Sequence, residues 1–197
     1  GGMIVQFVVN TYGVLFIAGF TATNKLYGLL EIAATSYGYA VTSFVGQNLG
    51  GGLFARIRKG MRSAAVIALI TSAVIAAAML LLGKLFLGLF ISGTTEEVSA
   101  SMDIAYKYLA IMSLFLPVLY MLHIYRSALM GLGDTVVPMI SGFMEMVMRV
   151  GIALLLPLLL TDGIYYAEVG AWTGAAVLLT LAYFVRMRKY PLADKKT

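Results

Sequence analysis

Charged side chains within long apolar segments are the residues of this sequence best suited to chemistry. Glu145 and Arg149 stand four positions apart in one such segment, so on a helix they share a face and are predicted to pair. A charge at this depth in an apolar environment is unfavourable unless it faces a partner or a wet cavity. The pair is either a binding site that presents a carboxylate to a cation, or a structural ion pair that neutralises itself.

Other polar side chains occupy apolar segments nearer the N-terminus. Gln6 and Asn10 are also four apart, and their amides must face protein or water because lipid would leave them unpaired. They form a cavity wall that recognises a ligand or ion, or they bond neighbouring helices together. Glu31 either binds a cation or reaches headgroup water, and both interpretations stay open.

Aromatic rings and a proline add further candidates. Tyr37 and Tyr120 offer ring faces to organic cations, although core packing is the commoner use of such side chains. His123 is interpreted as a satisfied histidine rather than a proton relay. Pro117 lies in the middle of an apolar segment, where its ring prevents the helical bond to the Ser113 carbonyl, so a kink and a hinge are predicted there.

The composition indicates which kind of protein positions these groups. Hydrophobic residues make up 61% and charged residues 12% of the chain, whereas soluble domains carry about 25% charged residues. Cysteine is absent and histidine occurs once, which argues against disulfides, thiolate metal sites and zinc enzymes. No motif of an intramembrane enzyme is visible. We therefore predict an all-α integral membrane protein that is not an enzyme.

Six apolar segments are long enough to cross a bilayer, which needs about 20 helical residues for each crossing. The sequence predicts one six-helix domain followed by a basic tail at 186–197, with membrane spans at residues 3–20, 26–45, 63–91, 106–125, 135–160 and 169–185.

The loop charges predict the orientation. Net charge is +5, and clustered Lys and Arg beside apolar segments indicate cytoplasmic loops rather than nucleic-acid binding. The predicted cytoplasmic loops and tail carry ten cations, namely Arg56, Arg58, Lys59, Arg62, Arg126, Arg186, Arg188, Lys189, Lys195 and Lys196. The opposite loops carry Lys25 and Lys107. Both chain ends are therefore predicted on the cytoplasmic side of the plasma membrane.

Two loop segments have a distinctive spacing of glycine and polar residues. The first, at 45–52, reads V-G-Q-N-L-G-G-G, and its glycines permit close helix packing while Gln47 and Asn48 are predicted to bond across helices. The second, at 129–138, reads L-M-G-L-G-D-T-V-V-P, which predicts a helix stop, an N-cap and a proline in the next first turn.

Both segments resemble signatures of the multidrug and toxic-compound extrusion (MATE) family. The first resembles V-G-Q-N-x-G-A after the second helix of each MATE half, and the second resembles L-Q-G-x-G-D-T-x-x-P between the fourth and fifth helices. The matching positions are Gly46, Gln47, Asn48, Gly50, Gly131, Gly133, Asp134 and Pro138. Gly51 and Met130 depart from the pattern.

The resemblance implies one C-terminal half of a twelve-helix antiporter that exports organic cations in exchange for Na⁺ or H⁺. It implies no cofactor beyond that ion, and as partners the bilayer, small organic cations and an N-terminal six-helix half, with the chain beginning inside the seventh helix. Some bacterial members carry a coupling carboxylate on the helix matching residues 106–125, yet residues 108–125 contain no Asp or Glu. The alternatives are a flippase for lipid-linked oligosaccharides and an inactive truncated fragment.

Overall fold

The computed structural model describes residues 2–160, 162–192 and 194, and within them it is helical with no strand. The α-helices and 3-10 helices (η) are α1 (Gly2–Val9), η1 (Asn10–Tyr12), α2 (Val14–Gly50), α3 (Phe54–Leu87), α4 (Thr95–Leu114), α5 (Leu116–Gly131), α6 (Val136–Leu155), η2 (Leu156–Leu158), η3 (Gly163–Tyr165) and α7 (Tyr166–Met187). The predicted all-α class is confirmed.

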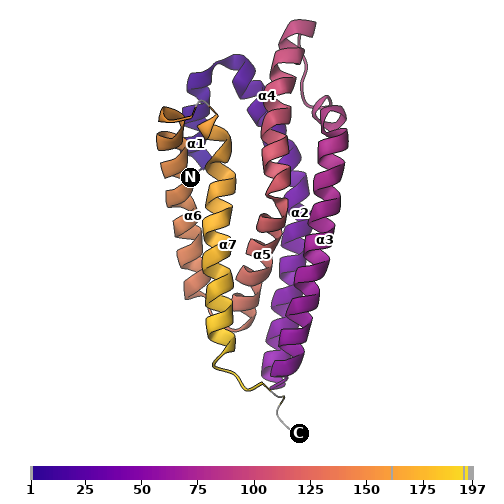
Figure 1. Ribbon diagram of the computed structural model, residues 1–197, viewed down its shortest axis with the longest axis vertical. Helices are drawn as coiled ribbons and strands as arrows, with labels where there is room; N and C mark the ends of the chain where they lie inside the picture. The colour runs from indigo at the N-terminus through magenta and orange to yellow at the C-terminus, as the bar shows by residue number, and fades with distance from the viewer. Residues whose placement is uncertain (1, 161, 193, 195–197) are drawn as a thin grey trace.

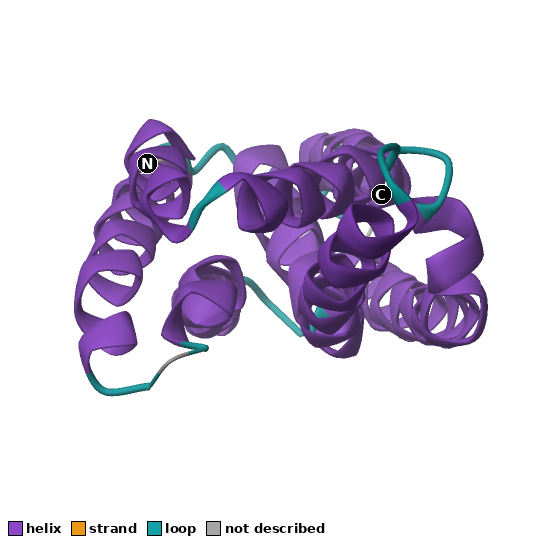
Figure 2. Cartoon of the chain, turned by 90° about the horizontal axis from the view of Figure 1, so that it is seen from above, coloured by secondary structure: helices purple, strands orange, loops and turns teal. Residues whose placement is uncertain are grey.

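The long helices run roughly side by side along the long axis of the molecule (Figure 1). Helix α5 contacts α2, α3 and α7, while α6 packs mainly on α7. Seen from above, these helices form an elongated layer rather than a ring (Figure 2). Helices α5 and α7 therefore connect α2 on one side to α6 on the other.

The first two predicted spans differ from the structure. We predicted a break between residues 20 and 26, but α2 continues through Lys25 as one helix of 37 residues. One lysine in a run of helix-compatible residues does not end a helix, because its long side chain can reach the membrane surface. The chain breaks instead at Gly13, whose φ of +96° favours glycine.

The remaining predicted spans fall on helices. By length and composition, Phe54–Leu87, Val136–Leu158 and Gly163–Met187 are each long and apolar enough to cross a membrane. The pair α4 and α5 makes a fourth candidate if it counts as one bent span. At about 1.5 Å of rise for each residue, α2 and α3 exceed the ~30 Å hydrocarbon core and must tilt or project from it.

The connections separate by charge as predicted. The α2–α3 and α5–α6 turns and the C-terminal end of α7 lie at one end of the bundle, which we call the basic end (Figure 1). Helix α1 lies toward the opposite end (Figure 1). The side of the membrane on which each chain end lies remains a prediction. Lys195 and Lys196 of the predicted tail lie outside the described residues.

The predicted kink at Pro117 is confirmed. Helices α4 and α5 meet at Phe115 with a bend of 49°, and Pro117 occupies the first turn of α5. A proline is tolerated there because first-turn amides have no partner within the helix. Its use as a hinge remains a prediction.

The two glycine-rich segments pack against each other at the basic end. A Cβ atom on Gly131 would lie 2.8 Å from the Thr42 carbonyl oxygen and 2.8 Å from Val45 Cβ, so α5 approaches α2 more closely than a side chain allows. Asn48 was predicted to bond across helices, but its side-chain amide donates to Phe44 O of its own helix at 2.7 Å. That part of the prediction is wrong, because the close backbone contact leaves glycine rather than amides at the interface.

Gly131→Ala is expected to destabilise the protein by about 1–3 kcal/mol, because the added methyl group meets backbone atoms that cannot rotate away. Thermal unfolding of the purified protein measures the effect. Gly142→Ala in α6 is the matched control, since a Cβ there meets open space. Equal melting temperatures for the two variants would contradict the close α2–α5 contact.

Asp134 caps helix α6 and connects it to α7. Its Oδ1 accepts hydrogen bonds from the Val136 and Val137 amides at 3.1 and 3.2 Å, and its Oδ2 accepts one from Arg186 Nε at 2.6 Å. Burial opposes ionisation of this carboxyl, but the Val137 amide and the Arg186 guanidinium outweigh it and hold its pKa below the ordinary value. The N-cap residue of α6 is Thr135, which makes no side-chain cap bond, and Asp134 just before it accepts the bonds of the first-turn amides.

Asp134→Asn is expected to destabilise the protein at neutral pH by about 1–2 kcal/mol through loss of the ionic part of these bonds. Because the carboxyl pKa is depressed by folding, its contribution is present above the unfolded pKa of about 4 and is lost as the pH falls through the folded value. Melting temperatures from pH 7 to pH 3 should converge for the wild type and the variant. A constant difference across that range would show that ionisation of Asp134 contributes nothing.

Candidate functional site

Among the described residues, three pairs of ionisable side chains connect helices α2, α5, α6 and α7. Glu31 of α2 faces His123 of α5, with 3.6 Å between Oε1 and Nε2. The other pairs are Arg149 of α6 with Glu168 of α7, at 2.9 Å between Nε and Oε2, and Arg126 of α5 with Glu145 of α6. Each pair therefore joins two different helices.

The predicted pair between Glu145 and Arg149 does not form, which corrects the sequence analysis. Each of the two residues bonds to a neighbouring helix instead, Glu145 to Arg126 and Arg149 to Glu168. Spacing of four permits a pair on one helix, but such a pair contributes only about 0.3–0.5 kcal/mol. A buried charge gains more from a partner that also ties two helices together.

The arginine pairs are shielded, whereas Glu31 is partly open. Side-chain exposure is 20% for Arg149 and 19% for Glu168, and 25% for Arg126 and 13% for Glu145. Glu31 is 38% exposed. It is thus the carboxylate of the three with the most room for a ligand.

Aromatic side chains lie beside Glu31. Tyr27, one helical turn earlier on α2, stacks on Trp172 of α7 with ring centroids 5.2 Å apart. Tyr27 also lies within electrostatic range of Glu31, Arg149 and Glu168. These five side chains therefore form one cluster from α2, α6 and α7. Together with His123 of α5, we call them the Glu31 cluster.

The Tyr108 hydroxyl of α4 lies buried near this cluster. Glu168, Tyr27 and Arg149 are all within electrostatic range of it, yet among the described side chains it has no hydrogen-bond partner.

The side chains of the Glu31 cluster are of the types that can bind a cation or a proton. Arginine stays protonated at all ordinary pH values, so Glu145 and Glu168 keep permanently charged partners. Glu31 instead faces the imidazole of His123, so no guanidinium has to be displaced when a cation binds to it. A carboxylate beside aromatic faces also suits an organic cation.

The other predicted binding residues lie apart from this cluster in the contacts that the structure records. Gln6 donates to Asn10 at 2.9 Å, so these amides pair with each other on α1 and η1. The Tyr37 hydroxyl bonds to Thr71 at 2.9 Å, and its ring lies 6.0 Å from that of buried Tyr120. Whether they bind a ligand remains a prediction.

Sequence reasoning missed most partners of the cluster. Tyr27 was detectable, because it stands four residues before Glu31 on the same helix face. Arg126 and Glu168 were assigned to loops, since they flank apolar segments, and Trp172 gave no signal at all. His123 was interpreted as structural, and the structure places it against Glu31.

Comparison with known proteins gives two similarities. Residues 1–155 match the MatE family. The fold is similar to that of a MOP superfamily transporter from Pyrococcus furiosus, whose description states that reverse polarity of its binding pocket suggests a different function. That match has a TM-score of 0.84 at 19% identity and covers 94% of this chain but 42% of the other. No curated protein matched the sequence.

Proposed function

The chain belongs to the MatE family of transporters, and from this premise we propose that it forms one half of a secondary active antiporter. The proposed activity is export of organic cations in exchange for Na⁺ or H⁺. The chain spans less than half of the similar Pyrococcus furiosus transporter, which supports a second helical half as the missing partner. The proposed location is the plasma membrane.

The observation that carries this proposal is the partly open carboxylate of Glu31 beside the stacked rings of Tyr27 and Trp172. Glu31 attracts positive charge, and the tyrosine face adds a cation–π contact for a ligand that reaches it. His123 lies within 3.6 Å on the facing helix. An incoming cation and a proton or Na⁺ can therefore compete for the same carboxylate.

Competition of this kind is sufficient for exchange. Coupling requires that the ion and the organic cation favour different conformations of the same site. With the ion bound, Glu31 is neutralised and the organic cation is released. When the ion leaves, the carboxylate regains its charge and binds the next organic cation.

A lipid-linked oligosaccharide flippase is the alternative within the same superfamily. It needs cations to bind pyrophosphate, and the interior contains Arg126 and Arg149. Each of these arginines is paired with a glutamate in this structure, so the interior favours a cationic ligand over an anionic one. The reversed pocket polarity stated for the Pyrococcus furiosus transporter shows why the substrate's charge must be measured.

The test is transport by the complete protein reconstituted in vesicles, with Na⁺ and pH gradients imposed separately. We expect ethidium to move against its gradient when one of the two ion gradients is present and to stop when that gradient collapses. A fluorescent anion of similar size is the control. Transport of the anion instead of ethidium would contradict the proposal. So would ethidium transport that depends on neither gradient.

A further inference from the structure

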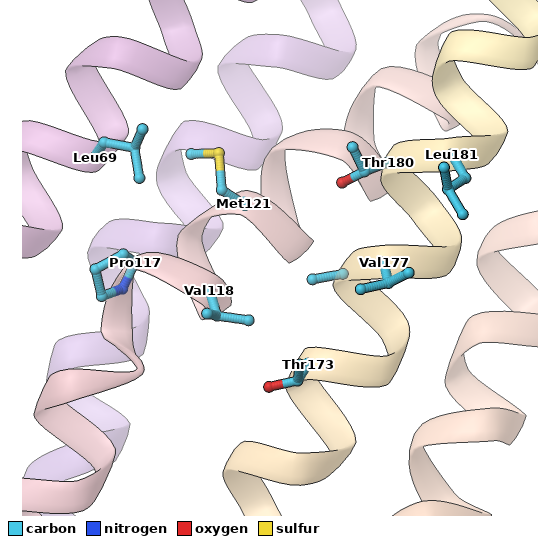
Figure 3. Close-up of a pocket in the computed structure, with 9 residues that line it drawn as sticks. Leu69, Pro117, Val118, Met121, Thr173, Val177, Thr180 and Leu181 are labelled. Atoms are coloured by element: carbon cyan, nitrogen blue, oxygen red, sulfur yellow. The ribbon is translucent and has the colours of Figure 1, made fainter.

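An apolar groove runs along the outside of the bundle between α3 and α7, with α5 as its floor. Leu69 of α3, Val118 and Met121 of α5, and Val177 and Leu181 of α7 point into it (Figure 3). The space has a volume of about 400 Å³ and is lined almost entirely by carbon atoms. It does not overlap the Glu31 cluster.

The groove continues toward the basic end as a second hollow of about 400 Å³. Leu69 lines both hollows, so they lie next to each other. The second hollow adds apolar residues of α3 and three aromatic rings, and it ends at two arginines. Those residues are Met61, Ala65 and Val66, then Tyr125, Tyr183 and Phe184, and finally Arg58 and Arg62.

The lining of the groove therefore changes along its length from apolar side chains to aromatic rings and then to cationic side chains. The ring of Tyr125 lies 5.3 Å from that of Tyr183 and 6.1 Å from that of Phe184, so the aromatic part is one cluster. A membrane lipid has the same order: acyl chains, then the interface where Tyr and Trp collect, then the headgroup.

The two arginines have different surroundings. Arg58 donates to the carbonyl oxygens of Met187, Tyr190 and Pro191 at 2.6 to 2.9 Å, so it fastens the C-terminal segment to α3. Arg62 lies one turn further along α3 and is exposed. It also lines a shallow hollow with Lys59. Arg62 thus presents a cation at the mouth of the groove, and Lys59 adds a second one in the adjoining hollow that Arg62 also lines.

We propose that this groove binds an anionic phospholipid, with its acyl chains along Leu69, Val118 and Val177 and its phosphate at Arg62 and Lys59. The charge at the mouth selects the lipid, because Lys and Arg beside a membrane attract anionic headgroups. An organic cation would meet repulsion there, and an apolar helix would leave the two cations unmatched. The site is independent of the transport function proposed above.

Native mass spectrometry of the complete protein in detergent tests this site with added phosphatidylglycerol and phosphatidylcholine. We expect phosphatidylglycerol to bind preferentially, and Arg62→Gln and Lys59→Gln each to weaken its binding about fivefold. Leu69→Trp should weaken binding of phosphatidylglycerol by filling the groove. The controls are Arg188→Gln, an exposed cation outside the groove, and Leu81→Trp, an exposed position elsewhere on α3.

Equal binding of the two lipids would overturn the proposal. So would unchanged phosphatidylglycerol binding by the Arg62 or Leu69 variants while they remain folded, as judged by their melting temperatures. Cross-linking of Leu69→Cys to another part of the complete protein would also overturn it, because the groove would then be an interface between halves.

Discussion

Glu31→Gln is expected to lower ethidium transport by the complete protein by at least about tenfold, because a charged hydrogen-bonding or ion-pair contact contributes roughly 1.5–3 kcal/mol. The substitution keeps the size of the side chain and removes its charge. Transport in reconstituted vesicles, driven by the gradient that supports the wild type, measures the effect. Dependence on that gradient should also disappear, since in the proposed exchange the same carboxylate binds the coupling ion.

Glu96→Gln is the matched control for this experiment. Glu96 is an exposed glutamate in the first turn of α4, at the opposite end of the bundle from the basic end. Glu96→Gln changes the net charge of the protein by the same amount as Glu31→Gln and leaves the Glu31 cluster intact. Glu31 would be removed from the mechanism if its variant transported ethidium as the wild type does, with unchanged ion dependence.

Glu31 differs from Glu145 and Glu168 most importantly in the side chain that faces it. Glu145 and Glu168 are more shielded, but their arginine partners cannot give up a proton at ordinary pH. A ligand at either of them would have to displace a permanent charge. At Glu31 the facing group is the imidazole of His123, so a ligand there displaces no guanidinium.

The sequence predicted the helices and turns better than the charge pairs, for a physical reason. A turn is local: the spacing of Gly131, Gly133 and Asp134 specifies a helix stop and a cap within six residues, and the structure has both. The kink at Pro117 is local in the same way. Arg126 pairs with Glu145 nineteen positions away, and nothing in either segment identifies that partner.

The first predicted spans failed for a related reason. Hydropathy marked Lys25 as a boundary, because a charge usually lies at the end of a membrane span. The helix continues past it, and the break occurs at Gly13, where the backbone takes a positive φ. The pattern of apolar residues predicts which segments lipid covers. The position at which the helix breaks depends instead on the backbone conformation of one glycine.

Glu168→Gln is expected to destabilise the protein by about 3 kcal/mol, because it leaves the shielded charge of Arg149 without its partner. The double variant Arg149→Met with Glu168→Leu should recover most of that stability, since no charge is then buried. Melting temperatures of the purified protein and the two variants measure both effects. Recovery in the double variant separates loss of a charge partner from simple loss of packing.

The pair of Lys107 and Asp162 is the exposed counterpart of the shielded pair of Arg149 and Glu168. Its two side chains are 51% and 46% exposed, although the ions lie only 2.6 Å apart. Asp162→Asn should therefore change stability by less than about 1 kcal/mol, because water screens an exposed pair and solvates the charge that remains. Equal losses for Asp162→Asn and Glu168→Gln would mean that the interior around Arg149 is as wet as the surface, and the shielding argued for the pair of Arg149 and Glu168 would then have no physical basis.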